Sequence, residues 1–424
     1  MIKIVLLVIF YFTFPLLIIY MCKKWSVLQK LGTIVLAYVF GLILGSSGIF
    51  PEGSDQYKLA LQGRTALPGS ELEKLINDGV IPAEDKFVNQ IATVQDLIPT
   101  VVVPLAFPLL LFSLNIKRWL KYARKGFVSV ALALIAGLVM VTAGFFIWKD
   151  SIPDSWKLAG MFEGIYTGGT PNFVAIKMAL NVDPNLFVIV STYDMIIGAV
   201  LVLFFITVAP KIFRTFLPKF AEEKELSAEG DLIAKETETL EDFSGMLNKK
   251  TLFPLLKALG VSVIIFALAG GISLVLPMFP QMVVVILSIT TLAILASLLK
   301  PLNKIEKTFQ LGMYLILVFS LTVASMADLK SMFSIGMLDL ILFISWCYFG
   351  SLILHLILAK IFKVDADNFL ITATAFIFSP PFVPLVANAL KNKDLIVTGI
   401  TGGIIGYVLG NYFGVALAYF LKGF

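Results

Sequence analysis

Histidine, cysteine and charged residues are all scarce in this chain of 424 residues. It contains one histidine and two cysteines, and only 14% of its residues are charged. Cys22 and Cys347 lie in separate apolar runs without neighbouring metal-ligand residues, which argues against a disulfide framework and a Cys/His metal site. His355 stands alone in the apolar run SLILHLIL, so we expect a structural histidine rather than a proton relay.

Recognisable catalytic motifs are absent as well. The chain has no Walker loop following a strand, no H-E-x-x-H and no G-x-S-x-G. These absences argue against ATP hydrolysis and intramembrane proteolysis. We therefore expect a protein that is not an enzyme, with no metal site and no cofactor.

Hydrophobic residues, in contrast, are abundant. They make up 58% of the chain, Phe alone occurs 36 times, and the mean hydropathy is +0.93. Such a composition is typical of a protein solvated by a lipid bilayer. The net charge of +5 comes from basic residues grouped in short loops, which argues against nucleic-acid binding. The apolar N-terminus lacks an A-x-A cleavage site, so we predict a retained membrane helix rather than a signal peptide.

Apolar runs long enough to cross about 30 Å of hydrocarbon recur along the chain. The predicted crossings are 2–21, 32–49, 94–113, 126–147, 186–209, 254–276, 280–299, 308–326, 334–361 and 394–421. Two further apolar stretches, 157–180 and 367–390, are interrupted. If both are re-entrant hairpins, most basic residues fall on the cytoplasmic side, as the positive-inside rule requires. This topology predicts a multi-pass protein of the plasma (inner) membrane with both termini outside.

Two loops divide the chain. The acidic outer segment 50–92 is predicted to carry one short helix around 70–79. The acidic stretch 221–246 has the composition of a solvated tether and lies near the midpoint of the chain. We therefore predict a first repeat at 1–210, a cytoplasmic linker at 211–253 and a second repeat at 254–424.

The two halves resemble each other. PNFVAIKMAL at 171–180 aligns with PPFVPLVANAL at 380–390, and weaker similarities occur in the same order in both halves. Because each half has five predicted crossings, the second half enters from the opposite side of the membrane. The predicted fold class is an all-α polytopic membrane protein, with two inverted repeats of five transmembrane helices that each contain a re-entrant hairpin or broken helix.

The interruptions have the residues that end one helix and begin another. Gly168-Gly169 suits a helix C-cap, and Thr170-Pro171 and Ser379-Pro380 suit the N-cap and first position of a new helix. Free backbone N–H groups at the start of the new helices would form an anion-binding site within the hydrocarbon core of the membrane. The alternative is a kinked helix whose free backbone groups hydrogen-bond to neighbouring residues. The predicted substrate-binding residues are Thr167, Gly168, Gly169, Thr170, Pro171, Asn172, Ser379, Pro380, Pro381 and Asn388.

Ionisable side chains within the apolar runs are candidates for ion coupling. Asp194 in STYDMIIG lies near mid-membrane, and Asn411 occupies the comparable helix of the second half. We predict that the inverted repeat brings both near the hairpin tips, with Thr192 adding an oxygen and Glu163 as a further coupling residue. A purely structural hydrogen bond is the alternative for Asp194. The glycines between 402 and 414 are expected to serve close helix packing.

The motifs at these positions resemble the DUF819 family of membrane proteins. The resemblance rests on YTGGTPNFVA, SPPFVPLV, GYVLGNYFG and VPLAFPLLLFSL, and it covers about residues 30–49 and 94–421. That family is functionally uncharacterised and related to the cation:proton antiporter/anion transporter superfamily, whose sodium–glutamate symporters have a similar two-hairpin layout. The first tip, Thr170-Pro171-Asn172, departs from the Ser-Val-Asn common in the family.

Together with the broken helices, the resemblance implies a transporter fold. The expected function is ion-coupled secondary transport of a small organic anion, an amino acid or carboxylate, with Na⁺ or H⁺ as the coupling ion. An elevator mechanism is expected, with both hairpins in a mobile core and the other helices in a scaffold that forms a homodimer. The alternatives are a cation/proton antiporter centred on Asp194 and a non-transporting receptor or structural membrane protein.

Overall fold

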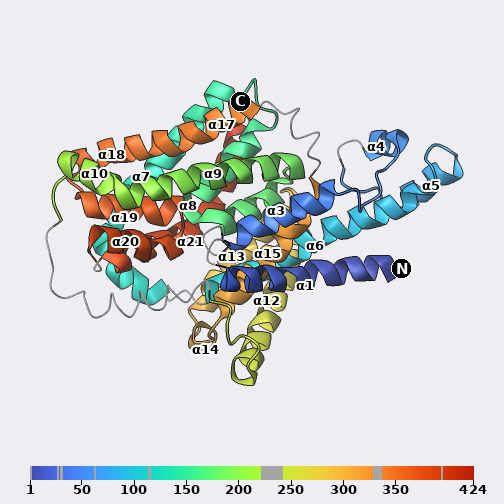
Figure 1. Cartoon of the computed structure of the whole chain (residues 1–424), viewed down its shortest axis with the longest axis horizontal. Coiled ribbons are helices and arrows are strands. Elements are labelled where there is room, and N and C mark those ends of the chain that lie inside the picture. Colours follow the sequence, from blue (N-terminus) through green and yellow to red (C-terminus); the bar gives the residue numbers. More distant parts are fainter. Residues whose placement is uncertain are drawn as a thin grey trace. The chain divides into compact units, whose positions relative to one another are not determined.

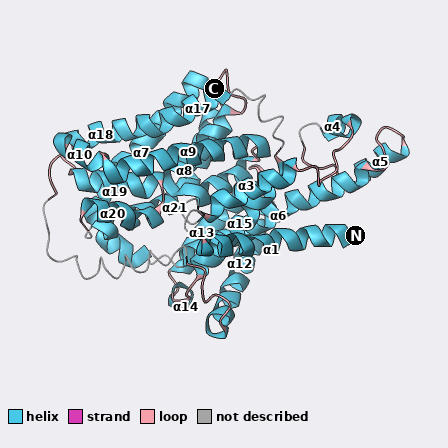
Figure 2. Ribbon diagram, in the orientation of Figure 1, coloured by secondary structure: helices cyan, strands magenta, loops and turns pink. Residues whose placement is uncertain are grey.

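Helices account for all regular structure in the described part of the chain. The computed structural model describes residues 2–25, 28, 32–61, 64–112, 116–220, 242–327, 337–392 and 395–424, apart from the side chains of 116–125, 337 and 381. Within these ranges no strand occurs (Figure 2). The predicted all-α class is thereby confirmed. The central part of the predicted linker, 221–241, lies outside the described residues.

In the part of the chain that the structure describes, eight helices are long and apolar enough to cross a membrane. Within lipid a helix satisfies its own backbone hydrogen bonds, so runs of Leu, Ile, Val and Phe can be apolar all round. These helices are α1 (Ile2–Lys24), α6 (Asp85–Phe112), α7 (Ile116–Trp148), α9 (Pro184–Thr207), α12 (Lys249–Val275), α15 (Thr308–Met326), the continuous helix formed by α17 (Met337–Ser345), η2 (Trp346–Gly350) and α18 (Ser351–Ile361), and α21 (Leu395–Leu421).

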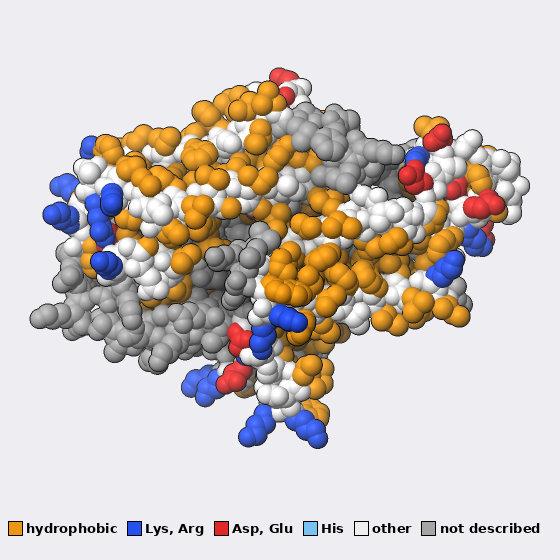
Figure 3. All heavy atoms as spheres, viewed as in Figure 1, with side chains coloured by type: hydrophobic (Ala, Val, Ile, Leu, Met, Phe, Trp, Pro, Cys, Tyr) orange, Lys and Arg blue, Asp and Glu red, His pale blue; other side chains and the backbone are white. Residues whose placement is uncertain are grey.

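These helices make the chain a multi-pass membrane protein, and they coincide with eight of the predicted crossings. The other two predicted crossings are the shorter helices α3 (Thr33–Ser46) and α13 (Gln281–Ser297), with 14 and 17 residues. At about 1.5 Å per residue, α3 is about 21 Å long, which is less than the hydrocarbon thickness of about 30 Å. Figure 3 shows hydrophobic side chains over the long helices, with Lys and Arg gathered near α10 and around α12 and α14.

The remaining helices are short or interrupted. The first interrupted stretch is α8 and the second is the sequence of α19, η3 and α20. Their bounds, with those of the surface helices, are α4 (Asp55–Leu61), α5 (Gly69–Asn77), α8 (Ser155–Leu180), α10 (Ala209–Phe216), α14 (Lys300–Asn303), α19 (Ala366–Ile377), η3 (Pro380–Phe382) and α20 (Val383–Leu390).

The outer segment folds around a small core of its own. Tyr57, Leu67, Leu72 and Ile81 are buried together, and α5 confirms the helix predicted around 70–79. The Asn89 side chain accepts from the Tyr57 hydroxyl (2.8 Å) and bonds both backbone groups of Leu67. Burial, followed by the nearby Asp85 carboxylate, raises the pKa of Tyr57 to about 12. The described residues of the segment therefore have a hydrophobic core of their own.

The chain forms two compact units that are interleaved in sequence. The first comprises Met1–Val103, Asp183–Ile189 and Met313–Ile335, and the second comprises the rest. A buried polar bridge ties three helices of the first unit: the Tyr11 hydroxyl lies 2.6 Å from Ser325 Oγ and 2.9 Å from Gln95 Nε2. These units do not follow the predicted division at the linker, so the repeat boundaries stay a prediction.

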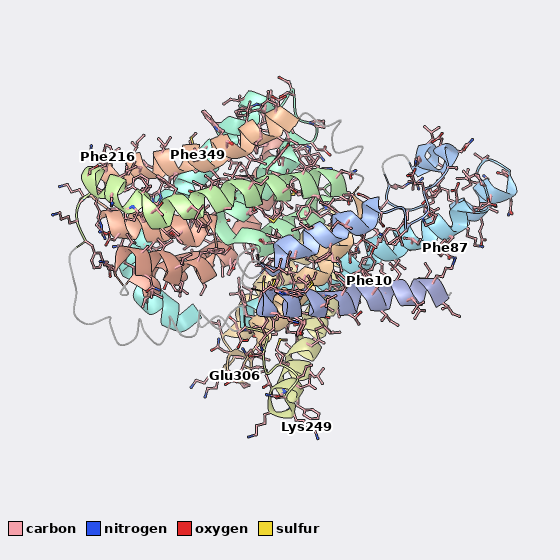
Figure 4. All side chains as sticks on the ribbon, viewed as in Figure 1. Phe10, Phe87, Phe216, Lys249, Glu306 and Phe349 are labelled. Atoms are coloured by element: carbon pink, nitrogen blue, oxygen red, sulfur yellow. The ribbon has the colours of Figure 1, made fainter. Side chains whose placement is uncertain are left out.

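The residues that build the candidate site belong to the second unit. Within it α21 packs against α8, α7, α19 and α20 (Figure 1). Among the residues of this unit that Figure 4 labels are Phe349, on the π-helical turn η2, and Phe216, the last residue of α10.

Candidate functional site

The first interrupted stretch turns back on itself at Gly169. Its φ of 63° and ψ of −159° are non-helical, although the helical pattern continues on either side. Residues at equal distances on either side of Thr170 are neighbours: Gly164 faces Ile176, and Gly160 faces Leu180. At the open end, Lys157 Nζ lies 3.5 Å from the carbonyl of Asn181. The segment is therefore a hairpin with two helical arms, which we call hairpin 1.

The second interrupted stretch, hairpin 2, turns at Ser379. This residue has a backbone φ of 76°, which is unusual for any residue other than glycine. The two ends of the hairpin lie together, since Asp367 at the start of α19 accepts from Asn392 Nδ2 (3.4 Å) beyond α20. Arg214 of α10 bridges the same ends by bonding Asp367 and the carbonyl of Leu390. Both predicted interruptions are thus reversals of the chain.

The glycines of α21 form the surface on which both hairpins lie. Gly399 faces Ile371 and Val383 of hairpin 2, whereas Gly414 faces the backbone of Gly160 and Gly164 in hairpin 1. At the midpoint, a Cβ on Gly406 would collide with the carbonyl of Thr167. The two hairpins therefore approach from opposite ends of α21, and the glycine face serves close packing as predicted.

The two tips meet near the middle of α21. A Cβ on Gly169 would collide with the hydroxyl of Ser379, and Pro380 packs against Gly403. Ser379 occupies the predicted N-cap position, but its hydroxyl makes no capping hydrogen bond to the backbone. The residues of the two tips are small or polar, and most of them are enclosed by the protein. Those that are buried are Thr167, Gly168, Pro171 and Pro380, and Thr170 is half-buried.

Asn172 is the polar centre of the tips. It is fully buried, and its Nδ2 donates to the carbonyl of Gly406 (3.1 Å). Its Oδ1 has no hydrogen-bond partner in the described part of the chain. A small cavity of about 10 Å³ adjoins it, lined by Phe107, Leu110, Leu111, Pro171, Asn172 and Tyr407. This volume accommodates about one water molecule, so a larger ligand requires the surrounding helices to separate.

Glu163 lies on the first arm of hairpin 1, before the tip. Its side chain is fully buried, and neither carboxyl oxygen has a hydrogen-bond partner among the residues that the structure describes. Its surroundings are Tyr166 one turn further along and the glycine backbone of α7 at Gly137. A buried carboxylate without partners is strongly destabilising, so the site favours a neutral carboxyl group or a bound cation.

Asp194 is held by a tyrosine of the π-helical turn. The hydroxyl of Tyr348 donates to Asp194 Oδ1, and the Tyr348 ring packs edge-on against Phe162 at a centroid distance of 4.9 Å. π-Helical turns inside α-helices occur often at functional sites. Tyr348 thus links Asp194 to Phe162 on the first arm of hairpin 1. Along that arm, Phe162 lies roughly 10 Å from the turn at Gly169.

The candidate site lies within the part of the chain that a family model matches. A model of the family described as "Protein of unknown function (DUF819)" matches residues 80–424, which include both hairpins and the π-helical turn. The chain belongs to the DUF819 family. It is also 24% identical over 356 residues to the uncharacterized membrane protein YjcL of Bacillus subtilis (strain 168), covering 82% of this chain and 87% of that protein.

Other predicted site residues of this DUF819 protein lie apart from one another. Asn411 is fully buried and donates to Thr290 Oγ1 of α13 (3.1 Å), whereas Asp194 pairs with Tyr348. Thr192 is half-buried on α9, and Asn388 is exposed near the end of α20. The backbone of Pro381 belongs to η3, and its side chain lies outside the described residues. The structure thus brings together the two tips, and it pairs Glu163 with the neighbouring Tyr166 and Asp194 with Tyr348.

Sequence reasoning missed Tyr166, Tyr348 and the ion pair of Arg214 with Asp367. A tyrosine in an apolar run cannot be distinguished by sequence from other large side chains that only pack in the core. No sequence pattern predicts a π-helical turn. The one available signal was Asp367, an acid at the start of an apolar stretch. His355 is buried, with Nε2 lying 3.3 Å from Ser129 Oγ, in agreement with a structural role.

The Arg214–Asp367 pair yields a prediction about hairpin 2. Asp367 is 4% exposed, whereas the side chain of Arg214 is 43% exposed. Arg214→Gln leaves a buried carboxylate without its cation, so we expect a loss of about 2 kcal/mol in the free energy of unfolding. Asp367→Asn leaves a guanidinium that water can reach, so its cost should be below about 1 kcal/mol.

The measurement is unfolding of the purified protein in detergent. Lys211→Gln on the same helix is the matched control, because Lys211 is exposed. Equal stability of the Arg214→Gln and Lys211→Gln proteins would show that the pair does not hold hairpin 2.

Proposed function

We propose that this protein is an ion-coupled secondary transporter of a small organic anion. The observation that carries the proposal is the meeting of two hairpin tips, at Gly169 and Ser379, beside the buried amide of Asn172. Secondary transporters built from inverted repeats place their sites where such broken helices meet. The approach of the hairpins from opposite ends of α21 supports the inverted-repeat layout within this proposal.

The chemistry of the tips suggests the class of substrate. The second arm of hairpin 1 and the helix that follows Ser379 both begin at the tips, and helix N-termini favour a carboxylate. Asn172 Oδ1 is a buried acceptor that lacks a donor in the described part of the chain. An ammonium or hydroxyl group of the substrate would supply that donor. Amino acids and hydroxy acids are therefore the favoured substrates.

An elevator mechanism in a homodimer of the inner membrane completes the proposal. Its support is that both hairpins and the glycine face of α21 belong to one compact unit, which could move as one body. The proposed coupling residues are Glu163 and Asp194. The coupling ion is H⁺ or Na⁺, and both termini are placed outside the cell.

A cation/proton antiporter is the second candidate function. The hydrogen bond from Tyr348 to Asp194 favours it, because a membrane carboxylate that is held in place can exchange a cation for a proton. Such a protein would exchange cations in a pH-dependent manner without any organic substrate.

Uptake into proteoliposomes tests these candidates. The protein is reconstituted and offered radiolabelled amino acids, hydroxy acids and dicarboxylates with a proton gradient, a sodium gradient or neither. We expect gradient-dependent accumulation of at least one amino or hydroxy acid, and its loss in Asn172→Ala. Asn77→Ala in the exposed end of α5 is the matched asparagine control. Cation exchange without organic flux would favour the antiporter, and binding without any flux would favour a receptor.

A further inference from the structure

We infer that the coupling ion is a proton and that Glu163 carries it, reached from Asp194 through the hydroxyls of Tyr348 and Tyr166. This inference rests on the proposed transport function and names its coupling ion. It starts from the carboxyl group of Glu163, which is fully buried and whose two oxygens both lack partners among the described residues.

The surroundings of Glu163 offer little to a metal cation. A hard cation needs several oxygen ligands around it. The carboxyl group lies against the glycine backbone of Gly137 on α7 and next to the ring of Tyr166, and neither surface offers a charged oxygen. The hydroxyls of Tyr166 and Ser351 face each other without closing a hydrogen bond of normal geometry. A proton needs no such shell, because a neutral carboxyl group can be buried at much lower cost.

Charged neighbours do not stabilise an ionised Glu163 either. The titratable groups coupled to it are Tyr166 on its own helix and Cys347 on η2, and both are neutral at neutral pH. On α21, Gly410 and Gly414 face Asn172, Thr167, Ile176 and the backbone of Gly160 and Gly164, none of which carries a charge. Lys177 occupies the matching position on the other arm of hairpin 1, but it has an interaction of its own and no hydrogen bond to Glu163. Asp194 on α9, coupled to Tyr348, adds only negative charge.

The hydroxyls of Tyr348 and Tyr166 are the proposed relay groups between the two carboxyl groups. Tyr348 donates to Asp194 and its ring packs against Phe162, which precedes Glu163, whereas Tyr166 lies beside Glu163 at Gly137. The Tyr166 hydroxyl makes no hydrogen bond among the described residues, so the transfer requires it to bond first one neighbour and then the other. Asp194 is half-buried whereas Glu163 is fully buried, so Asp194 is the outer member of the pair. Each tyrosine gives up one proton as it accepts another. The tyrosines therefore end unchanged, Asp194 loses one proton and Glu163 gains it.

Infrared spectroscopy of the protein in lipid nanodiscs tests the inference without any substrate. We expect a carbonyl stretch of a protonated carboxylic acid at neutral pH, lost in Glu163→Gln and retained in Asp194→Asn. Adding Na⁺ should leave this band in place. Absence of the band in the native protein, or its removal by Na⁺, would overturn the assignment to a proton.

The rate of hydrogen–deuterium exchange tests the path. After transfer to heavy water, the band should shift more slowly in Asp194→Asn and in Tyr348→Phe than in the native protein. Tyr193→Phe, next to Asp194 on α9, is the matched control and should not slow the shift. Equal rates in all four proteins would remove Asp194 and Tyr348 from the path.

Flux measurements separate this inference from the function on which it rests. In proteoliposomes, uptake of a transported amino or hydroxy acid should rise with an inward proton gradient, and Glu163→Gln should lose that response. Uptake driven by Na⁺ alone would refute the proton while supporting the transporter. No uptake of any anion would refute the transporter, and the infrared band would still decide the protonation of Glu163.

Discussion

Gly169→Ala is expected to abolish transport. The backbone at Gly169 has a φ of 63° and a ψ of −159°, a conformation that is essentially restricted to glycine. Forcing alanine into it costs about 1–3 kcal/mol. The new Cβ would also collide with the hydroxyl of Ser379, and overpacking of this kind typically costs a further 1–3 kcal/mol or so. The tips can then no longer meet as they do in the native protein.

Two matched variants make this prediction specific. Gly260→Ala, in α12, places a Cβ where no atom lies within 4 Å and should unfold like the native protein. Ser379→Gly removes the hydroxyl that would collide with the new Cβ. Glycine also adopts the positive φ of position 379 without strain. The Gly169→Ala/Ser379→Gly double variant should therefore recover part of the lost stability. Stability is measured by unfolding in detergent and transport by uptake. Native uptake by Gly169→Ala would show that the contact between the tips is not required.

Asp194→Asn is expected to abolish the response of uptake to the ion gradient while leaving the fold intact. The amide keeps an oxygen that can accept from the Tyr348 hydroxyl, so the contact between α9 and η2 survives. The amide cannot take up or release a proton, however, and it carries no charge for a cation. Uptake should therefore become equal with and without the gradient, at an unchanged unfolding temperature.

Removing the tyrosine should act differently. Tyr348→Phe leaves the carboxylate of Asp194 without its donor, and hydrogen bonds to charged groups contribute about 1.5–3 kcal/mol. We therefore expect a loss of both stability and coupling, compared with little change in Tyr193→Phe on α9. If Asp194→Asn still concentrates substrate with native ion dependence, Asp194 is a structural residue and the coupling ion does not pass through it.

The position of the two tips was predictable from local chemistry. Gly168-Gly169 before Thr170-Pro171, and Ser379 before Pro380, disfavour a continuous helix whatever surrounds them. The structure has a positive φ at Gly169, as a glycine break allows, and also at Ser379, where Ser-Pro chemistry does not call for one. Asn172 could be proposed as a site residue because it directly follows the break. Asn388 matched the repeat pattern equally well, but the structure places it on the exposed surface of α20.

The partners of the buried polar groups could not be predicted in this way. Asp194 and Asn411 occupy comparable helices, yet one bonds Tyr348 and the other Thr290. These partners are 154 and 121 residues distant along the chain. Which side chain reaches which depends on helix rotation and on the π-helical turn at Trp346–Gly350, both of which are set by packing.

The sequence by itself determined that this is an all-α membrane protein with two broken helices, because hydropathy and Gly/Pro chemistry act locally. Tertiary structure alone decided that the breaks are hairpin reversals whose tips touch, because that requires α21 to pack against both hairpins through its glycines. It also decided that Glu163 is left without a partner in the described part of the chain, since burial is a property of the packed unit and not of a residue.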